Sequence, residues 1–120
     1  MGARCTFVFK QSDGNAVGLY SHWGEYGMYQ DLAAALQHAA PRKHDESYYI
    51  RMAISYLLQD SILDETGYGI SAFNYTDSHM MFLDHPIVID ISKDQVMDDT
   101  GAHSIDEFIK YHGLVTTVTS

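Results

Sequence analysis

The sequence predicts a single α+β domain in which an antiparallel β-sheet packs against two main helices and a short C-terminal helix. Strand-like residues surround an early Asp-Gly turn, apolar residues recur at helical spacing in the middle of the chain, and strand-like segments return after residue 69. With 120 residues, 46% of them hydrophobic and 19% charged, the chain can form one core. We expect one domain over residues 1–120, with a frayed tail over residues 115–120.

The first element is a predicted β-hairpin. The segments CTFVFKQ (residues 5–11) and AVGLYSHW (residues 16–23) flank a turn that contains Asp-Gly. A two-residue loop would place Phe7 opposite Tyr20. We favour a three-residue loop through Asn15, which pairs Phe9 with Leu19 and groups four apolar residues on one face: Phe7, Phe9, Val17 and Leu19.

Two helices follow in the middle of the chain. The first carries an apolar stripe from Met28 to Ala39 and stops before Pro41. The second covers about residues 46–63, starts after the good N-cap residue Asp45, and has the most regular apolar stripe in the sequence. Gly67 is placed where a left-handed cap would end this helix.

The C-terminal half predicts further strands and a short helix. ISAFNYT after Gly69 and PIVIDIS (residues 86–92) have strand character, residues 95–97 form a partner strand, and residues 79–83 form a shorter strand or part of a loop. Ser104 and Glu107 make a capping box that opens a helix over residues 105–111, closed near Gly113. The predicted order is ββααβββα.

Charge and cysteine content exclude several function classes. Seven Lys and Arg against sixteen Asp and Glu give a formal charge of −9, so nucleic acid and anionic membranes are poor direct partners. A single cysteine makes neither an internal disulfide nor a cysteine-based zinc cage, which indicates a reducing compartment. No apolar run approaches the ~20 residues needed to cross a bilayer, the N-terminus lacks the apolar stretch of a secretory signal, and no phosphate-binding glycine motif is complete. We expect a cytoplasmic protein without cofactor or metal.

The most unusual segment is YSHWGEYGMY, residues 20–29. Aromatic side chains with polar tips beside flexible glycines can form a recognition surface, because they give a large contact area at a small cost in entropy. The same rings could instead close the core where a strand leads into a helix. The predicted binding residues of this segment are Tyr20, His22, Trp23, Glu25, Tyr26 and Tyr29.

The C-terminal third offers a second candidate surface. Seven acidic residues lie between Asp84 and Glu107, with Lys93 as the opposing charge. The negative electrostatic field of these residues can steer the protein onto a basic partner, and their carboxylates can imitate the phosphates of nucleic acid. The same charges also favour solubility. The predicted binding residues here are Asp94, Asp98 and Asp99.

The motif YSHWGEYG, the alanine-rich DLAAAL and the later ETGYGI give the sequence a family resemblance. It resembles small uncharacterised proteins of bacteriophages and of their actinobacterial hosts, from roughly Phe7 to Gly113. The resemblance implies a phage-type accessory protein that binds a host protein in the host cytoplasm, and it assigns a role to no residue.

Taken together, these features predict a non-catalytic, acidic protein-interaction module. Its partner is a protein, in one version a basic or nucleic-acid-binding host protein whose usual ligand it imitates. A second interpretation is a small hydrolase that depends on a metal or on Cys5 and uses His22 with His79, His85 or His103. A third is a homodimeric structural protein that self-associates through the aromatic segment or a strand edge.

Overall fold

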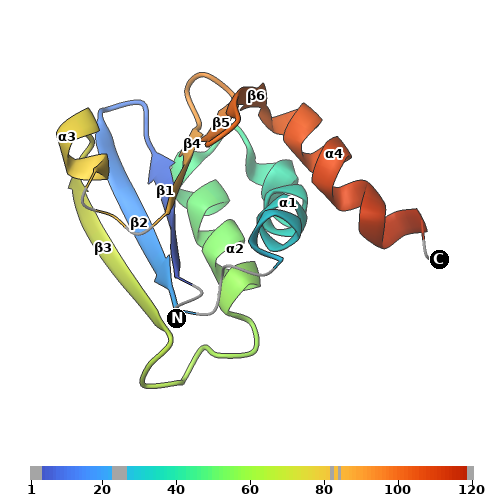
Figure 1. Ribbon diagram of the computed structural model, residues 1–120, viewed down its shortest axis with the longest axis horizontal. Helices are drawn as coiled ribbons and strands as arrows, with labels where there is room; N and C mark the ends of the chain where they lie inside the picture. The colour runs from blue at the N-terminus through green and yellow to red at the C-terminus, as the bar shows by residue number, and fades with distance from the viewer. Residues whose placement is uncertain (1–3, 23–26, 82, 84, 119–120) are drawn as a thin grey trace.

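The computed structural model describes residues 4–22, 27–81, 83 and 85–118 of the chain, with side chains through residue 113 (Figure 1). Within these residues the elements are β1 (Cys5–Lys10), β2 (Asn15–Ser21), α1 (Met28–Ala39), the 3₁₀ turn η1 (Ala40–Arg42), α2 (Glu46–Leu58), β3 (Tyr68–Asn74), α3 (Asp77–Met80), β4 (Pro86–Asp90), β5 (Gln95–Asp98), β6 (Gly101–Ser104) and α4 (Ile105–Val118). The α+β prediction is confirmed. None of the described helices is long and apolar enough to span a membrane.

The described strands form one sheet in the order β3-β2-β1-β4-β5-β6. All neighbouring strands are antiparallel except β1 and β4, which are parallel. The sheet is therefore mixed, whereas the sequence predicted an antiparallel sheet. The parallel pair arises because the chain leaves β1 toward one side, through β2 and β3, and then returns to the other side of β1.

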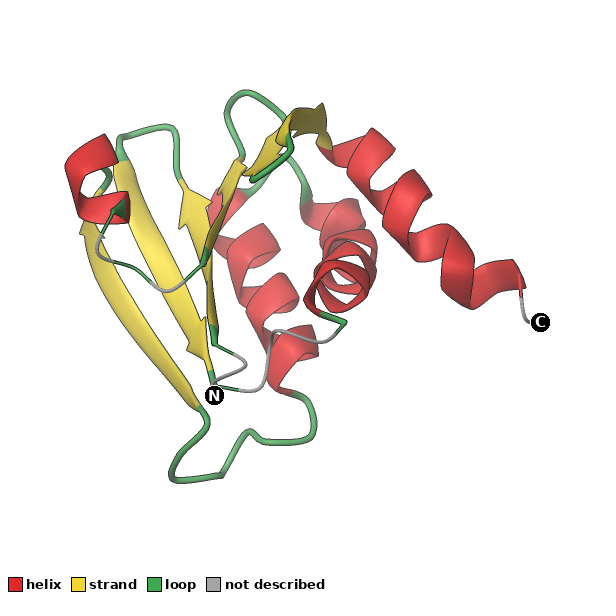
Figure 2. Ribbon diagram, viewed as in Figure 1, coloured by secondary structure: helices red, strands yellow, loops and turns green. Residues whose placement is uncertain are grey.

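The helices α1 and α2 cover one face of the sheet, and α4 packs on the side of α1 away from α2 (Figure 2). The main core lies between this face and the helices, where Phe7, Phe9 and Leu19 meet Leu32 and Leu36. A smaller apolar cluster covers the opposite face, beside α3, and contains Val8, Ala16, Val88, Phe73, Tyr75 and Met80.

The hairpin register differs from both predicted registers. Phe7 pairs with Leu19 and Cys5 with Ser21. The loop lies one residue earlier in the sequence than in the favoured prediction, so each residue of β1 pairs with a residue of β2 two positions earlier than predicted. Gln11 N donates to Asn15 O at 2.9 Å, and the left-handed Gly14 (φ 90°) makes this tight closure accessible. The predicted face of Phe7, Phe9, Val17 and Leu19 is nevertheless retained, because the shift of two residues preserves the alternation.

The first predicted helix is confirmed, whereas the second is shorter than predicted. Asp45 caps α2 by accepting a hydrogen bond from Tyr48 N, but the helix ends at Leu58 and not near residue 63. In the turns that follow, Ile62 is 63% exposed and Leu63 96% exposed. These apolar side chains therefore gain no packing that would stabilise a longer helix. Gly67 is left-handed, with φ 101°, but lies in the loop before β3 and does not cap the helix.

The C-terminal elements show three further differences from prediction. Residues 77–80 form the short helix α3, which Thr76 Oγ1 caps by accepting a hydrogen bond from His79 N, so the described residues 79–81 and 83 are not in a strand. The sequence reasoning missed β6, a four-residue strand that pairs with β5. The helix α4 passes through Gly113, near which the predicted helix closes, and reaches Val118, whereas the frayed tail over residues 115–120 stays a prediction.

Candidate functional site

A cleft of about 660 Å³ lies between the first turn of α1, the β5–β6 turn and the first two turns of α4. We call it the α4 cleft. Its aromatic lining comes from Tyr29, Phe108, Tyr111 and His112, and its polar lining from Asp98, Thr100, His103, Glu107 and Lys110. This volume falls in the range of clefts that hold a small ligand or a single large side chain of a partner.

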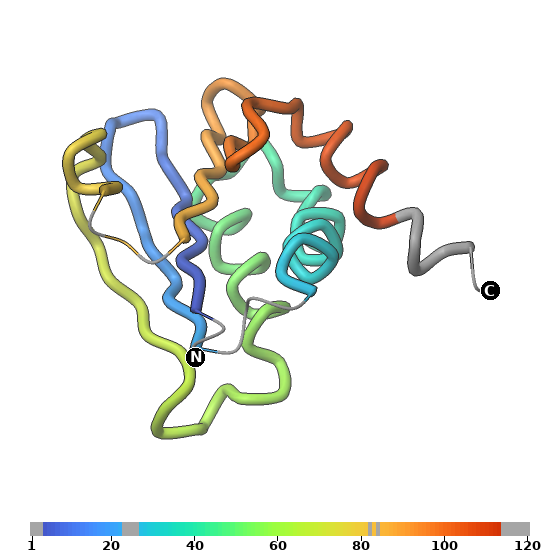
Figure 3. The backbone as a smooth tube through the Cα atoms, in the orientation of Figure 1, coloured from blue at the N-terminus to red at the C-terminus, as the bar shows by residue number. Residues whose placement is uncertain are grey.

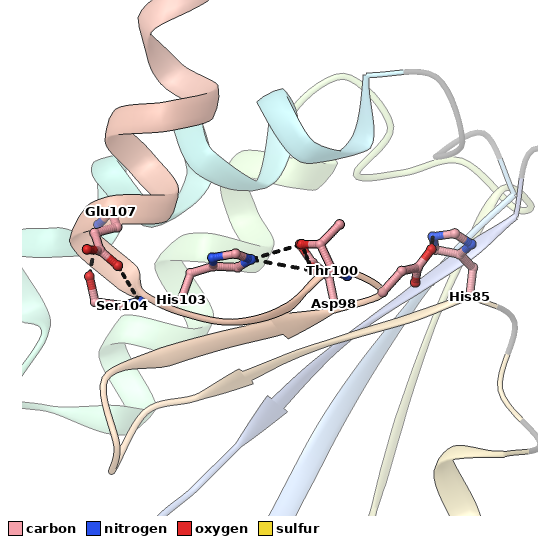
Figure 4. A network of polar contacts seen from close by, with 7 residues as sticks. His85, Asp98, Thr100, His103, Ser104 and Glu107 are labelled. Carbon is pink, nitrogen blue, oxygen red and sulfur yellow. Dashed lines mark hydrogen bonds and ion pairs between the residues drawn. The ribbon is translucent and has the colours of Figure 1, made fainter.

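The β5–β6 turn fixes the polar side of the α4 cleft. Asp98 Oδ1 accepts hydrogen bonds from Thr100 N at 2.8 Å and Thr100 Oγ1 at 2.6 Å. His103 Nε2 lies 3.0 Å from Thr100 Oγ1 and 3.6 Å from Asp98 Oδ1, so the imidazole points at both groups (Figure 4). The side chain of Asp98 is only 3% exposed, so its carboxylate is largely buried where it lines the cleft.

The capping box at the start of α4 fixes the opposite wall. Ser104 Oγ accepts from Glu107 N at 3.0 Å, and Glu107 Oε1 accepts from Ser104 N at 3.3 Å. This predicted capping box is confirmed, and it sets the direction in which α4 leaves the sheet (Figures 3 and 4). Phe108 is then buried against α1, so the next turn brings Tyr111 and His112 to the cleft.

Three aromatic rings contact the imidazole of His112. Tyr29 stacks on His112 with ring centres 5.0 Å apart and an interplanar angle of 16°. Phe108 lies 4.5 Å from the same imidazole, and Tyr111 meets it edge-on at 4.8 Å. These contacts hold the rings in one cluster of α1 and α4 side chains, so the cleft presents both ring faces and ring edges.

The ionisation states give the α4 cleft an acidic floor beneath neutral rings. Partial burial disfavours the Asp98 carboxylate, but the two hydrogen bonds from Thr100 and the nearby His103 outweigh it and lower the pKa of Asp98. Burial lowers the pKa of His112, with the charge of His103 acting in the same direction against that of Asp98. Burial, and then the charges of Asp99 and Asp98, raise the pKa of Tyr29. At neutral pH Asp98 is therefore ionised and Tyr29 protonated.

The structure brings only part of the predicted binding set together. Tyr29 and Asp98 line the α4 cleft, and Asp99 lies beside it in the β5–β6 turn, 3.9 Å from His85 Nε2. Tyr20 lies on the sheet face away from the helices, where its hydroxyl is 3.4 Å from Nδ1 of His22. Tyr20 and Tyr29 therefore lie on different surfaces of the protein.

One further predicted residue lies elsewhere, and three fall outside the described residues. Asp94 is outside the α4 cleft, in an ion pair of 2.6 Å with Lys43. Trp23, Glu25 and Tyr26 fall outside the described residues, so their part in a site stays a prediction.

Sequence reasoning missed most of the α4 side chains that line the cleft. Glu107 was recognised as a capping residue, but Phe108, Tyr111 and His112 were not recognised as cleft residues. The spacing of residues 107 and 111, and of 108 and 112, was the available signal, because residues four apart share a helix face. That signal does not reveal which element faces α4 across the cleft.

The described residues do not favour the hydrolase interpretation. Cys5 is fully buried, and burial followed by the charge of Asp31 raises the pKa of its thiol to about 12, so it is protonated at neutral pH. Among the described side chains, no group of three or more His, Cys, Asp or Glu could hold a metal ion. His79 instead packs on Phe73, with ring centres 4.5 Å apart.

Comparison of the chain with protein-family models, with curated proteins and with solved structures found no match in any of the three.

Proposed function

We propose that the protein is a non-catalytic interaction module that holds a basic protein partner by a cationic side chain in the α4 cleft. The observation that carries this proposal is that the carboxylate of Asp98, held by Thr100 and His103, lines the same cleft as the aromatic rings. Carboxylates attract guanidinium and ammonium groups, and aromatic faces attract the same cations through the ring quadrupole. The carboxylates and the aromatic rings that line the cleft thus both favour a cationic ligand.

Arginine suits this lining better than lysine. A guanidinium is planar, so it can stack on a ring such as Tyr111 while its N–H groups face a carboxylate such as Asp98 or Glu107. A lysine ammonium is a compact point charge that is more strongly hydrated, and it gains less from an apolar wall. Lys110 also lines the cleft, and its positive charge disfavours a cation close to it.

The distribution of acidic residues supports a partner bound at the α4 cleft. Asp90 is buried and lies 3.6 Å from Lys10 Nζ, and Asp94 pairs with Lys43, so these carboxylates are neutralised within the molecule. The charges of Asp98, Asp99 and Glu107 remain around the cleft and its rim. A basic host protein, including one that binds nucleic acid, is the partner class that this field would attract.

The test compares two peptides that differ by one charge. We expect calorimetric titration to show binding of a short glycine peptide with a central arginine, and much weaker binding of the same peptide with citrulline, the neutral isostere. Tyr111 is 76% exposed, so Tyr111→Ala should leave the fold intact and weaken binding of the arginine peptide by about threefold.

Tyr48→Ala is the matched control, because Tyr48 is 52% exposed and lies on α2, away from the α4 cleft. Its affinity for the arginine peptide should equal that of the wild type. Equal affinity for the arginine and citrulline peptides, or equal loss in both variants, would show that the cleft does not select a cation.

A further inference from the structure

The strand β3 forms one edge of the sheet, at the opposite end from β5 and β6 (Figures 1 and 2), which carry residues of the α4 cleft. It pairs with β2 over all seven of its residues, and no other described strand pairs with its outer side. Five of the seven residues are exposed. The outer backbone groups of β3 are therefore open to another strand.

Two hydrogen bonds beyond the strand ends identify the outward backbone groups. Tyr75 N donates to Gly14 O at 2.9 Å, and His22 N donates to Gly67 O at 2.8 Å, both in the β2–β3 register. Hydrogen-bonded pairs recur at every second residue of an antiparallel ladder, so the odd-numbered residues of β3 bond to β2. The even-numbered residues direct their N–H and C=O groups outward: Tyr68, Ile70, Ala72 and Asn74.

The edge lacks the features that usually prevent strand pairing. The sequence of β3, YGISAFN, contains no charged residue and no proline. Beside it an apolar groove of about 430 Å³ lies between β3 and α2 and is lined by Ile54, Leu58 and Ile70. Ile70 is 60% exposed, so apolar surface continues from the groove to the edge.

We propose that β3 is the interface of a homodimer, in which two β3 strands pair antiparallel about a two-fold axis at Ser71. This register pairs Tyr68 with the partner's Asn74 and Ile70 with the partner's Ala72, so every outward N–H meets an outward C=O. The outward groups of β3 are thus self-complementary over the full strand. A register shifted along the strand would leave some of them unpaired.

Two side-chain features favour a second copy as the occupant. The register places Phe73 opposite the partner's Gly69, which has no side chain to meet it, while the Phe73 ring itself lies over Gly18 and against His79 of its own chain. The uncharged strand also lets two chains of charge −9 approach without opposing like charges within the paired strands. The dimer would join the two sheets and leave both α4 cleft sites outside the interface.

The first test measures the molar mass by sedimentation equilibrium over a range of concentrations. We expect a dimer for the wild type and a monomer for Ala72→Lys, which places a charge on the exposed edge opposite the partner's Ile70. Ser78→Lys is the matched control, because it makes the same change of charge on α3, and it should remain dimeric. Circular dichroism checks that both variants are folded.

The second test examines the register. Residues directly opposite in a non-hydrogen-bonded pair have Cα atoms about 4.5 Å apart, within the range of a disulfide. Ser71→Cys should therefore cross-link two chains under mild oxidation, whereas Ser78→Cys should not; the native Cys5 is buried and does not compete. A wild type that stays monomeric, a dimer that survives Ala72→Lys, or a dimer that does not cross-link through Ser71→Cys would each overturn the proposal, without affecting the α4 cleft.

Discussion

Tyr49 is a fully buried residue whose hydroxyl has no hydrogen-bond partner among the described residues. Burial, followed by the charges of Asp94 and Asp106, raises the pKa of this hydroxyl, so it stays protonated. A buried polar group without a partner costs about 1–3 kcal/mol, and phenylalanine keeps the ring while removing that group. We expect Tyr49→Phe to raise the free energy of unfolding by about 1 kcal/mol.

Urea denaturation measures this change, and Tyr48→Phe is the control. Tyr48 is 52% exposed, so its hydroxyl reaches water and its removal should change stability little. A loss of stability in Tyr49→Phe would mean that the hydroxyl has a partner, such as a buried water.

Asp98 should make the stability of the protein depend on pH in acid. Its pKa is lower in the folded chain than in the unfolded chain, because the hydrogen bonds from Thr100 and the nearby His103 outweigh the effect of burial. Its contribution is therefore fully present above the unfolded pKa, near 4, and is lost as the pH falls through the lower folded pKa.

We expect Asp98→Asn to be less stable than the wild type at pH 7, with the difference shrinking as the pH falls below about 4. Asparagine retains a side-chain oxygen for the Thr100 hydrogen bonds, so the variant isolates the charge. Urea midpoints measured between pH 7 and pH 3 test this expectation. A difference that is constant with pH would assign the effect to the turn geometry and not to ionisation.

At the scale of elements, local signals predicted those helix starts that depend on one or two side chains. Asp45 and the pair Ser104 and Glu107 were identified because a cap satisfies backbone N–H groups within the same few residues. The strand β6 was missed because its sequence, GAHS, has little strand propensity and depends on pairing with β5. The hairpin register was missed because it depends on which residue closes the loop.

The α4 cleft was only partly predictable for the same reason. The sequence indicated Tyr29 and Asp98 separately, on the basis of aromatic content and charge. Their meeting depends on α4 packing against α1, a contact between segments about 75 residues apart. Local patterns do not encode that contact, so the aromatic wall from α4 became evident only in three dimensions.

The capping box links α4 to the stability of the whole cleft. Ser104→Ala removes the acceptor for Glu107 N, and loss of such a cap costs about 1 kcal/mol of folding free energy. We also expect weaker binding of the arginine peptide, because the first turn of α4 carries Glu107 and Phe108.

Thermal unfolding and the same titration test both expectations for Ser104→Ala. Ser78→Ala on α3 is the control, and it should match the wild type in both measurements. Full stability in Ser104→Ala would show that the capping box does not hold the start of α4.

At the scale of the whole molecule, the sheet separates two surfaces of different chemistry. One end carries the acidic and aromatic α4 cleft beside β5 and β6, and the other carries the uncharged edge of β3. Several acidic residues between them are neutralised by lysine, so the net charge of −9 acts mainly where carboxylates remain unpaired. The proposed cation site therefore holds part of the charge that is available to a partner.

The most direct measurement is the position of a bound arginine side chain, obtained from nuclear Overhauser effects between the arginine peptide and the labelled protein. The α4 cleft predicts contacts from the arginine methylene protons to the rings of Tyr29, Phe108 and Tyr111. Contacts confined to another surface, such as that around Tyr20 and His22, or the absence of any specific contact at saturating peptide, would contradict a cation site in this cleft.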